Sequence, residues 1–322
     1  MNKASLPENI YDIVIIGGGP AGLTAGLYAS RANLKVLLLE GASSISQITV
    51  TDIIENYPGM PDGIGGFELI ERFKRQALQF GLEIKTEDVS TVAKAVWGNT
   101  EGWKVTAGIN HYDALAVILA TGANWRKLGV RGEDNFLGKG VSFCATCDGP
   151  IFRNRDVLVV GGGDAAVQEA IFLTKFANKV TIVHRRDRLR ATKALEKKAL
   201  ANNKIEFAWN SVVEEISGGN TVEKVIIRDV KSADVRREIP VQGVFIFVGL
   251  TPKTDLVRGI VDLDDAGYIK VDGEMRTSAK GIFAGGDCTK KLLRQVITAC
   301  GDGATAAVSA QHYVEELKGE SY

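Results

Sequence analysis

The chain has little of what marks secreted, membrane or nucleic-acid-binding proteins. It contains four cysteines in 322 residues, too few for a fold held together by disulfides. Its longest apolar runs, Ala114–Ala120 and Val244–Val248, are far shorter than the about 20 residues that cross a bilayer. The 39 Lys and Arg residues are matched by 39 Asp and Glu residues, so no basic excess points to nucleic acid. We therefore expect neither a membrane nor a nucleic acid as partner.

We also expect no targeting signal. The residues before the first apolar segment include Lys3 and Glu8 and have no apolar core, which leaves no room for a signal peptide. The sequence thus predicts a cytoplasmic protein. Its length favours two domains, because a single core stops growing at roughly 250–300 residues. An apolar content of 45% supports two cores.

An internal repeat organises the chain. Residues 12–40 read DIVIIGGGPAGLTAGLYASRANLKVLLLE, and residues 156–184 align with them without a gap as DVLVVGGGDAAVQEAIFLTKFANKVTIVH. Each copy has a β-branched apolar run, a glycine turn, a helix-length segment with apolar residues three and four apart, and a second apolar run. The sequence therefore predicts two βαβ units in an α/β protein.

The first glycine turn is typical of a dinucleotide site. Gly17, Gly19 and Gly22 let the backbone turn sharply, approach a pyrophosphate and pack the helix on the sheet. Pro20 suits the first helical turn. Glu40 ends the second run, where a carboxylate accepts hydrogen bonds from ribose hydroxyls. A glycine-rich turn alone is a weak signal, but here strand, turn, helix, strand and carboxylate follow in order.

The second turn differs at the ribose position. A histidine stands where the first unit has its carboxylate, and arginines follow it. Such a cation cluster suits a 2′-phosphate, which guanidinium groups bind in a bidentate manner, so this turn is predicted to bind NADPH. The alternative is a solvent-exposed basic helix or a nucleic-acid patch. The residues concerned are Gly161, Gly163, Ala166, His184, Arg185, Arg186 and Arg190.

A pair of cysteines adds redox or metal chemistry. Cys144 and Cys147 stand three apart, a spacing that brings both sulfurs together where a helical turn begins, and the helix N-terminus lowers a thiol pKa. Because a flavin links hydride chemistry to dithiol chemistry, the pair favours FAD over NAD at the first turn. Asp148 is the candidate general acid and base beside the dithiol; the alternative is that it caps the helix.

Taken together, the motifs resemble the low-molecular-weight thioredoxin reductases over essentially the whole chain. The resemblance implies a homodimeric flavoenzyme that passes electrons from NADPH through FAD to a dithiol and then to thioredoxin. It also implies that Cys147 faces the flavin and Cys144 attacks thioredoxin, a choice that the sequence by itself leaves open. The segments that carry it are CATCDG (144–149) and HRRDRLRA (184–191), with GGGPAG (17–22), QITVTDIIENYPG (47–59), ATGA (120–123), GGGDAA (161–166), GIFAGGD (281–287) and RQVITACGDGATAA (294–307).

The resemblance also implies the residues that contact FAD. Asp287 follows an apolar strand that ends in two glycines, so it can accept a hydrogen bond from a ribityl hydroxyl. A helix from about Gln295 would aim its N-terminus at the same site. The alternative for Asp287 is an ordinary loop residue. The full set is Gly17, Gly19, Gly22, Glu40, Gln47, Asn56, Thr121, Asp287, Arg294, Gln295 and Ala304.

Three places depart from the family pattern. Ile45 and Ser46 stand where a glycine pair is usual, so we expect a stiffer or displaced loop over the flavin and an altered FAD affinity. Cys288 replaces an apolar residue, and Cys300 lies in the helix that closes the FAD site. Both are expected to be small buried residues; a zinc site built from the four cysteines is the alternative.

The order of motifs predicts a discontinuous domain. Residues 1–123 and 251–322 would form the FAD domain, and residues 124–250 an inserted NADPH domain that also carries the CATC dithiol. Each is expected to be a three-layer, Rossmann-like domain. Nicotinamide and disulfide must both reach the flavin from the same inserted domain. We therefore expect that domain to swing between two orientations.

Other functions share parts of this pattern. A reductase of another small disulfide protein, glutaredoxin-like or linked to a peroxiredoxin, would use the same core chemistry. A flavin-linked NADP reductase for ferredoxin shares the two βαβ units but has no use for the dithiol. A nucleotide-bound redox sensor would use Cys144 and Cys147 as a switch and would turn over slowly.

Overall fold

The chain folds into two compact units. The structure, a computed structural model, describes residues 7, 9–42, 46–50, 54, 56–232 and 234–319. Residues 1–124 and 251–322 form one unit, here called the host unit, and residues 125–250 form the inserted unit. The chain leaves the host unit and returns to it through two short paired strands, β7 (Ala123–Trp125) and β16 (Leu250–Pro252).

The host unit is built on a mostly parallel sheet. Within the described residues it has seven strands in the order β3-β2-β1-β6-β5-β4, with β17 beside β6. The first half of β6 pairs antiparallel with β5, and its second half pairs in parallel with β17. The strands are β1 (Tyr11–Ile16), β2 (Val36–Glu40), β3 (Glu83–Thr86), β4 (Val89–Trp97), β5 (Thr100–Ala107), β6 (Asn110–Leu119) and β17 (Ile282–Ala284).

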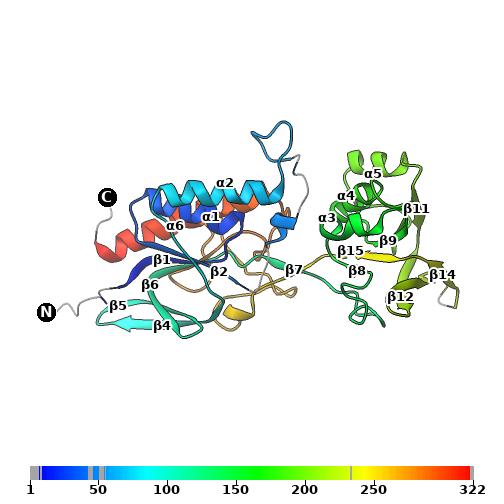
Figure 1. Ribbon diagram of the computed structural model, residues 1–322. Helices are drawn as coiled ribbons and strands as arrows, with labels where there is room; N and C mark the ends of the chain where they lie inside the picture. The colour runs from blue at the N-terminus through cyan, green and yellow to red at the C-terminus, as the bar shows by residue number, and fades with distance from the viewer. Residues whose placement is uncertain are drawn as a thin grey trace. The chain divides into compact units, whose positions relative to one another are not determined.

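Helices cover one face of the parallel strands of this sheet, and the β4–β5 hairpin lies on the side opposite the helices (Figure 1). Successive side chains of a strand point to opposite faces. Ile13 and Ile15 of β1 accordingly join the core under the helices, whereas Val14 and Ile16 pack with Trp103 on the hairpin side. The helices are α1 (Pro20–Arg31), α2 (Gly66–Gln79) and α6 (Val296–Lys318), with 3₁₀ turns η1 (Gln47–Val50) and η3 (Asp255–Val257).

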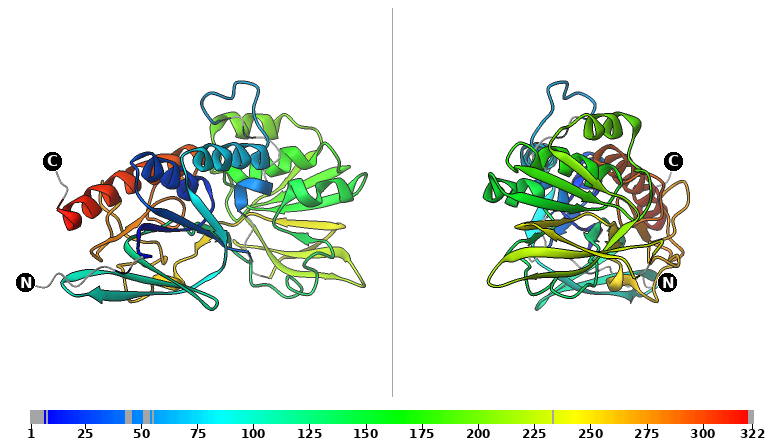
Figure 2. Two further views of the ribbon diagram at one scale, coloured as in Figure 1. Left: turned by 60° about the vertical axis from the view of Figure 1, so that its left-hand side comes forward. Right: turned by 90° about the vertical axis from the view of Figure 1, so that its right-hand side faces the viewer.

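The inserted unit repeats this plan on a smaller scale. Its parallel sheet has the order β11-β10-β9-β15-β8, and β12-β13-β14 form a separate antiparallel sheet. The order β11-β10-β9-β15 matches β3-β2-β1-β6 of the host unit, and Figure 2 shows helices and antiparallel strands on opposite sides of each parallel sheet. The elements are β8 (Val141–Ser142), α3 (Ala145–Asp148), η2 (Gly149–Phe152), β9 (Asp156–Val160), α4 (Asp164–Leu173), β10 (Lys179–Val183), α5 (Lys193–Leu200), β11 (Ile205–Ala208), β12 (Ser211–Gly218), β13 (Val222–Asp229), β14 (Arg236–Pro240) and β15 (Gly243–Ile246).

Both predicted βαβ units are confirmed. β1 pairs in parallel with β2 across α1, and β9 pairs in parallel with β10 across α4. The α/β fold class predicted from the repeat is therefore confirmed. In the described part of the chain no helix is both long and apolar enough to span a membrane.

Candidate functional site

The glycine turn between β1 and α1 depends on contacts that only glycine permits. Gly17 has a φ of +119°, and a Cβ there would lie 2.2 Å from the carbonyl oxygen of Ala120, which follows β6. A Cβ on Gly22 would lie 1.9 Å from the carbonyl oxygen of Gly17. Gly19 is the N-cap of α1, Pro20 follows it, and no side chain caps the helix. The first N–H groups of α1 can therefore face an anion.

Glu40 lies beside this turn at the end of β2. Its Oε1 accepts hydrogen bonds from Lys74 Nζ at 2.9 Å and from Thr86 Oγ1 at 3.0 Å. A Cβ on Gly18 would lie 3.0 Å from its Oε2, so the carboxylate rests against the turn. Sequence reasoning missed Lys74 and Thr86, because they come from α2 and β3 and no spacing connects them to Glu40.

Asp287 lies in the turn after β17 and has a buried oxygen to which no protein group donates. Its Oδ1 has no hydrogen-bond partner among the described residues. Burial raises the pKa of Asp287, the charges of Lys291 and Arg294 lower it, and Asp302 raises it. Arg294 Nε donates to the backbone oxygen of Asp287 at 3.4 Å, and its guanidinium lies 4.0 Å from the ring centroid of Tyr268. An unsatisfied carboxylate oxygen fits a ligand hydroxyl.

Two of the residues predicted to contact FAD, Gln47 and Thr121, donate hydrogen bonds to the backbone next to β7 and β16. Gln47 Nε2 donates to the backbone oxygen of Ala123 at 2.6 Å, and Thr121 Oγ1 donates to that of Lys253 at 2.6 Å. Both bonds lie at the start of β7 or the end of β16. The bond between Thr121 and Lys253 joins the segments on either side of the insertion, whereas Gln47 and Ala123 both precede it.

Two others meet at the N-terminus of α6. Asn56 Nδ2 donates to Gln295 Oε1 at 2.9 Å, and Gln295 is the N-cap of α6. The helix predicted from about Gln295 is therefore confirmed. Ser46 Oγ lies 3.6 Å from the position of a Cβ on Gly19, beside the glycine turn. Ile45, the other residue of that departure, lies outside the described residues.

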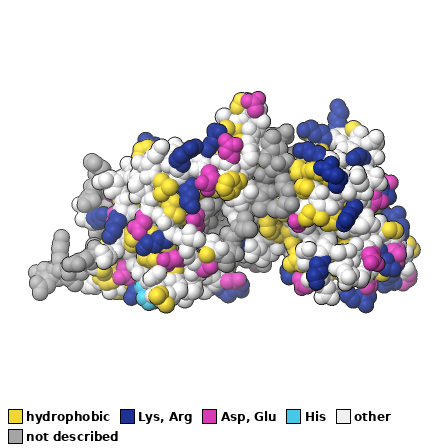
Figure 3. All heavy atoms as spheres, viewed as in Figure 1, with side chains coloured by type: hydrophobic (Ala, Val, Ile, Leu, Met, Phe, Trp, Pro, Cys, Tyr) yellow, Lys and Arg dark blue, Asp and Glu magenta, His cyan; other side chains and the backbone are white. Residues whose placement is uncertain are grey.

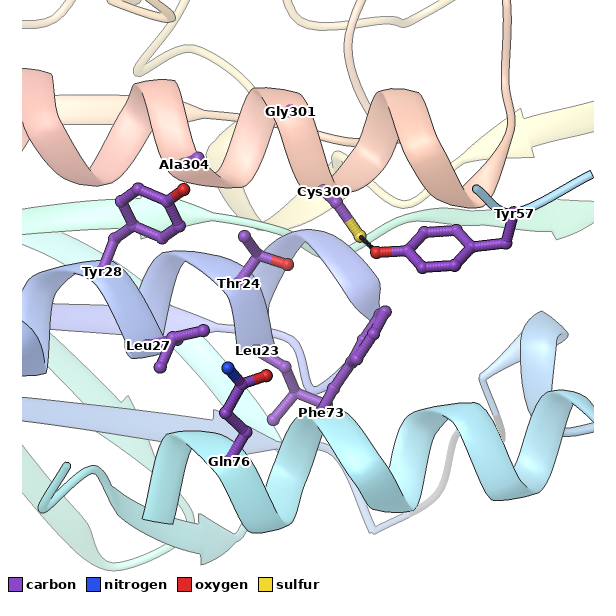
Figure 4. A pocket seen from close by; sticks show the side chains of 10 residues that line it. All are labelled: Leu23, Thr24, Leu27, Tyr28, Tyr57, Phe73, Gln76, Cys300, Gly301 and Ala304. Carbon is purple, nitrogen blue, oxygen red and sulfur yellow. Dashed lines mark hydrogen bonds between the residues drawn. The ribbon is translucent and has the colours of Figure 1, made fainter. Parts of the chain in front are cut away.

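A pocket of about 270 Å³ opens between α1, α2 and α6 (Figure 4). The Tyr57 hydroxyl donates to Cys300 Sγ at 3.9 Å, and Ala304, predicted to contact FAD, lines the same pocket. Burial raises the pKa of the Cys300 thiol and raises that of Tyr57 to about 12. Cys300 is thus a protonated thiol at neutral pH. Cys288 and Cys300 are free and buried, which confirms the expectation for both.

The second glycine turn repeats the contacts of the first. Gly161 has a φ of +146°, and a Cβ there would lie 2.4 Å from the carbonyl oxygen of Phe247 and 2.7 Å from Cβ of Ala166. Phe247 follows β15 as Ala120 follows β6. Gly163 is the N-cap of α4, and no atom lies within 4 Å of a Cβ built on it. Both units therefore fold around the same close approach of backbone to backbone.

His184 follows β10 and packs on this second turn. A Cβ on Gly162 would lie 2.5 Å from its ring, so only glycine fits beneath the imidazole. Its Nε2 lacks a hydrogen-bond partner in the described structure. Burial, and then the charges of three nearby arginines, lower the pKa of His184. Arg190 N donates to the oxygen of Gly162 at 2.6 Å, which folds the segment after His184 over the turn.

The three arginines are Arg185, Arg186 and Arg190. They are exposed and lie in the loop before α5, so the alternative of a basic helix is wrong for these residues. None of them pairs with a carboxylate in the described part of the chain. Lys and Arg side chains gather around α5 on the face that Figure 3 shows. Unpaired guanidinium groups beside a glycine turn fit a phosphate monoester.

Cys144 stands directly before α3 and is disulfide-bonded. Its N–H donates to Ser142 Oγ at 3.0 Å, and that hydroxyl donates to the Cys144 oxygen at 3.1 Å. Asp148 N donates to the same oxygen at 3.2 Å, and the Asp148 carboxylate does not cap η2. The side chain of Cys147 lies outside the described part of the structure. Among the described side chains, no group of three or more His, Cys, Asp or Glu could hold a metal.

A protein-family model matches most of the chain, including both glycine turns and the two cysteines of the CATC segment. The model, described as pyridine nucleotide-disulphide oxidoreductase, matches residues 11–303. The chain belongs to this family.

Its relatives match nearly end to end. The thioredoxin reductase of Listeria monocytogenes is 50% identical over 313 residues, which cover 97% of this chain and 96% of the relative. That of Treponema pallidum is 47% identical, with 97% and 99% covered. The crystal structure of Lactococcus lactis thioredoxin reductase superposes with a TM-score of 0.90 at 43% identity, over 95% of this chain and 99% of the other. The predicted resemblance is confirmed.

Proposed function

We propose that this member of the family is an NADPH-dependent thioredoxin-disulfide reductase that uses FAD. One observation carries the proposal. A single chain holds two glycine turns of the same geometry whose ribose positions differ, Glu40 in one and His184 with arginines in the other, together with a disulfide-bonded Cys144. Relatives named thioredoxin reductase support thioredoxin as the acceptor.

The host unit has the donors and acceptors that FAD requires. The turn at Gly17, Gly19 and Gly22 would hold the pyrophosphate. Glu40 and Asp287 are acceptors that suit ribose and ribityl hydroxyls. When bound, FAD takes two electrons from a nicotinamide and passes them to a disulfide. The remaining residues assigned to FAD are Gln47, Asn56, Thr121, Arg294, Gln295 and Ala304.

The inserted unit has the complementary chemistry for NADPH. Gly161, Gly163 and Ala166 shape a turn that leaves the N-terminus of α4 open. The cationic loop that His184 begins, with Arg185, Arg186 and Arg190, would bind the 2′-phosphate through charge-assisted hydrogen bonds. An acidic residue in the place of His184 would repel that phosphate. Because the site has arginines and no such acidic residue, we expect it to select NADPH over NADH.

Cys144 and Cys147 pass the electrons to the protein substrate. Two electrons and two protons convert their disulfide into two thiols. As a thiolate, Cys144 attacks one sulfur of the thioredoxin disulfide and expels the other, which leaves a mixed disulfide. Cys147 then attacks the Cys144 sulfur, re-forms the CATC disulfide and releases reduced thioredoxin. Asp148 would donate and accept the protons that these steps exchange.

Domain roles follow from the two sites. The host unit is the FAD domain, and the inserted unit is the NADPH domain that carries the dithiol. Because nicotinamide and dithiol belong to one unit, each must reach the flavin in turn, which requires the inserted unit to reorient between the half-reactions. The enzyme is further proposed to act in the cytoplasm as a homodimer. Light scattering on the purified protein tests the dimer.

Steady-state oxidation of NADPH with oxidised thioredoxin tests the function. We expect the yellow protein to turn over with NADPH, to have a kcat/KM about 100-fold lower with NADH, since several charge-assisted bonds are lost, and to be inactive as Cys147→Ser. Cys300→Ser, which changes a buried thiol outside the dithiol, is the control and should keep its turnover. If NADPH bleaches the flavin while thioredoxin stays oxidised, the acceptor is another disulfide protein. Absence of bleaching overturns the proposal.

A further inference from the structure

A largely buried ion pair, with part of each side chain still exposed, lies beside the Asp287 turn. Lys291 Nζ pairs with Asp302 Oδ2 of α6, and the two side chains are only 13% and 16% exposed. The same Asp302 oxygen accepts a hydrogen bond from the backbone N–H of Gly286 at 2.8 Å. One carboxylate therefore fixes both the residue before Asp287 and the lysine that follows the turn.

Three elements meet at this point. Gly286 has a φ of +82°, and a Cβ there would lie 2.9 Å from Cβ of Ala21 in the first turn of α1. A Cβ on Gly303, next to Asp302, would lie 2.1 Å from the oxygen of Ala21. The Asp287 turn and α6 thus both pack so closely on the start of α1 that neither glycine could carry a side chain without a shift. Within that contact, the Asp302 carboxylate joins α6 to the Asp287 turn through its bonds to Gly286 and Lys291.

We propose that Asp302 and Lys291 are positioning residues for FAD, which hold the Gly286–Asp287 turn so that the Asp287 carboxylate can bind the cofactor. The inference rests on the proposed FAD site. The Asp287 backbone is held on both sides, by Asp302 at the preceding N–H and by Arg294 at its own carbonyl oxygen. Its Oδ1 meanwhile has no partner in the part of the chain described. The protein thus fixes the main chain and leaves the carboxylate oxygen for the ligand.

Substitutions at the pair should weaken FAD binding in a graded way. Asp302→Ala removes both the acceptor for Gly286 and the counter-ion of Lys291, and should raise the FAD dissociation constant about 10- to 100-fold, the range for a lost charge-assisted hydrogen bond. Asp302→Asn keeps an oxygen for Gly286 but leaves Lys291 unpaired, so its effect should be smaller. Combining Asp302→Asn with Lys291→Met should cost less than the sum of the single changes.

Asp12 is a matched control in the same unit. Its Oδ1 pairs with Lys318 Nζ at the C-terminal end of α6, 2.8 Å away, and its Oδ2 accepts from the backbone N–H of Lys35 at 2.9 Å. It therefore makes the same two kinds of contact as Asp302, at the other end of α6. Asp12→Ala should lower the thermal stability of the protein without changing its FAD affinity.

The experiment titrates FAD into each apoprotein by fluorescence quenching and follows unfolding of the same samples by circular dichroism. Weaker FAD binding in Asp302→Ala than in Asp12→Ala at a similar loss of stability supports the proposal. FAD binding within twofold of wild type in Asp302→Ala, or equal weakening in both variants, overturns it. If Asp302→Ala does not fold, Asp302→Asn and Lys291→Met decide in the same way. A wild-type protein that binds no FAD refutes the proposed function itself.

Discussion

At the scale of single residues, each of the two proposed nucleotide sites contains a buried polar atom without a protein partner. These are Oδ1 of Asp287 and Nε2 of His184, as far as the described residues extend. Leaving such an atom unsatisfied costs about 1–3 kcal/mol, so each marks a position that a ligand can complete. Both residues follow a strand of a parallel sheet, the edge at which such folds bind their ligands.

The arginine loop should determine the choice of nicotinamide. Replacing Arg185 and Arg186 together by Ala removes two guanidinium groups from the proposed 2′-phosphate site. We expect KM for NADPH to rise about 100-fold, as two charge-assisted contacts are lost, and KM for NADH to stay unchanged. Steady-state kinetics with both nucleotides measure this. Lys198→Ala, which removes an exposed charge from α5, is the control; an equal rise for both nucleotides would contradict a phosphate site.

Asp287 should make the stability of the flavin-free protein depend on pH. Burial raises its pKa above the ordinary 3.8, so over the interval between the two values the folded protein binds more protons than the unfolded chain. The stability that this group contributes is therefore lost as the pH rises through the raised value. Asp287→Asn should unfold at a higher temperature than wild type at neutral pH, and this difference should disappear well below pH 3.8. A constant difference at all pH values would show another cause.

Residues within one motif could be predicted from the sequence, but their partners could not. Gly17, Gly161 and His184 lie in contiguous segments, where the order of strand, glycine turn, helix and second strand identifies their positions. Lys74 reaches Glu40 from α2, and Asp302 reaches Gly286 from α6. Such contacts depend on how distant elements pack, and no local spacing records them.

At the scale of elements, α6 crosses α1 at a point where no side chain fits. A Cβ on Gly303 would lie 2.1 Å from the backbone oxygen of Ala21. Gly303→Ala should therefore separate the helices and destabilise the protein by about 1–3 kcal/mol. Gly301→Ala, on the same helix but with no atom within 4 Å of the new Cβ, should stabilise it by up to about 1 kcal/mol. Chemical denaturation of both variants measures the difference, and similar shifts in both would contradict the close contact.

Most of the predicted elements carry the repeated pattern; the helix from about Gln295 is predicted from the family resemblance instead. Both βαβ units lie in contiguous, aligned segments, which is why the sequence predicts them. The antiparallel sheet of β12, β13 and β14 could not be predicted in this way, because its strands carry no ligand motif and pair through cross-strand contacts, with register shifts between Val213 and Glu215 and between Ser217 and Gly218.

At the scale of the whole molecule, the inserted unit has what an independent domain requires. It contains two hydrophobic cores of its own, one on each face of β9, because alternate strand residues point to opposite sides. Leu158 belongs to one core and Val159 to the other. The two ends of the unit are joined by a hydrogen bond from Arg126 N to the oxygen of Gly249 at 2.9 Å. The excised unit would therefore not have to bring distant ends together.

Residues 125–250 expressed alone should fold and bind the adenosine half of NADPH. We expect a cooperative thermal transition and retention on immobilised 2′,5′-ADP, because the proposed phosphate loop lies entirely within the unit. The same fragment with Arg185 and Arg186 replaced by Ala should fold but flow through the column. An unfolded fragment, or retention of both, would contradict this assignment.

The paired strands β7 and β16 also bear on how such a chain could arise. Lys253 N donates to the oxygen of Gly122 at 3.0 Å, so the host chain is already closed at the place where the insertion begins and ends. A duplicated βαβ segment placed there would add a second nucleotide site without altering the strand order of the first. Removal of the insertion would leave a gap that one tight turn could bridge.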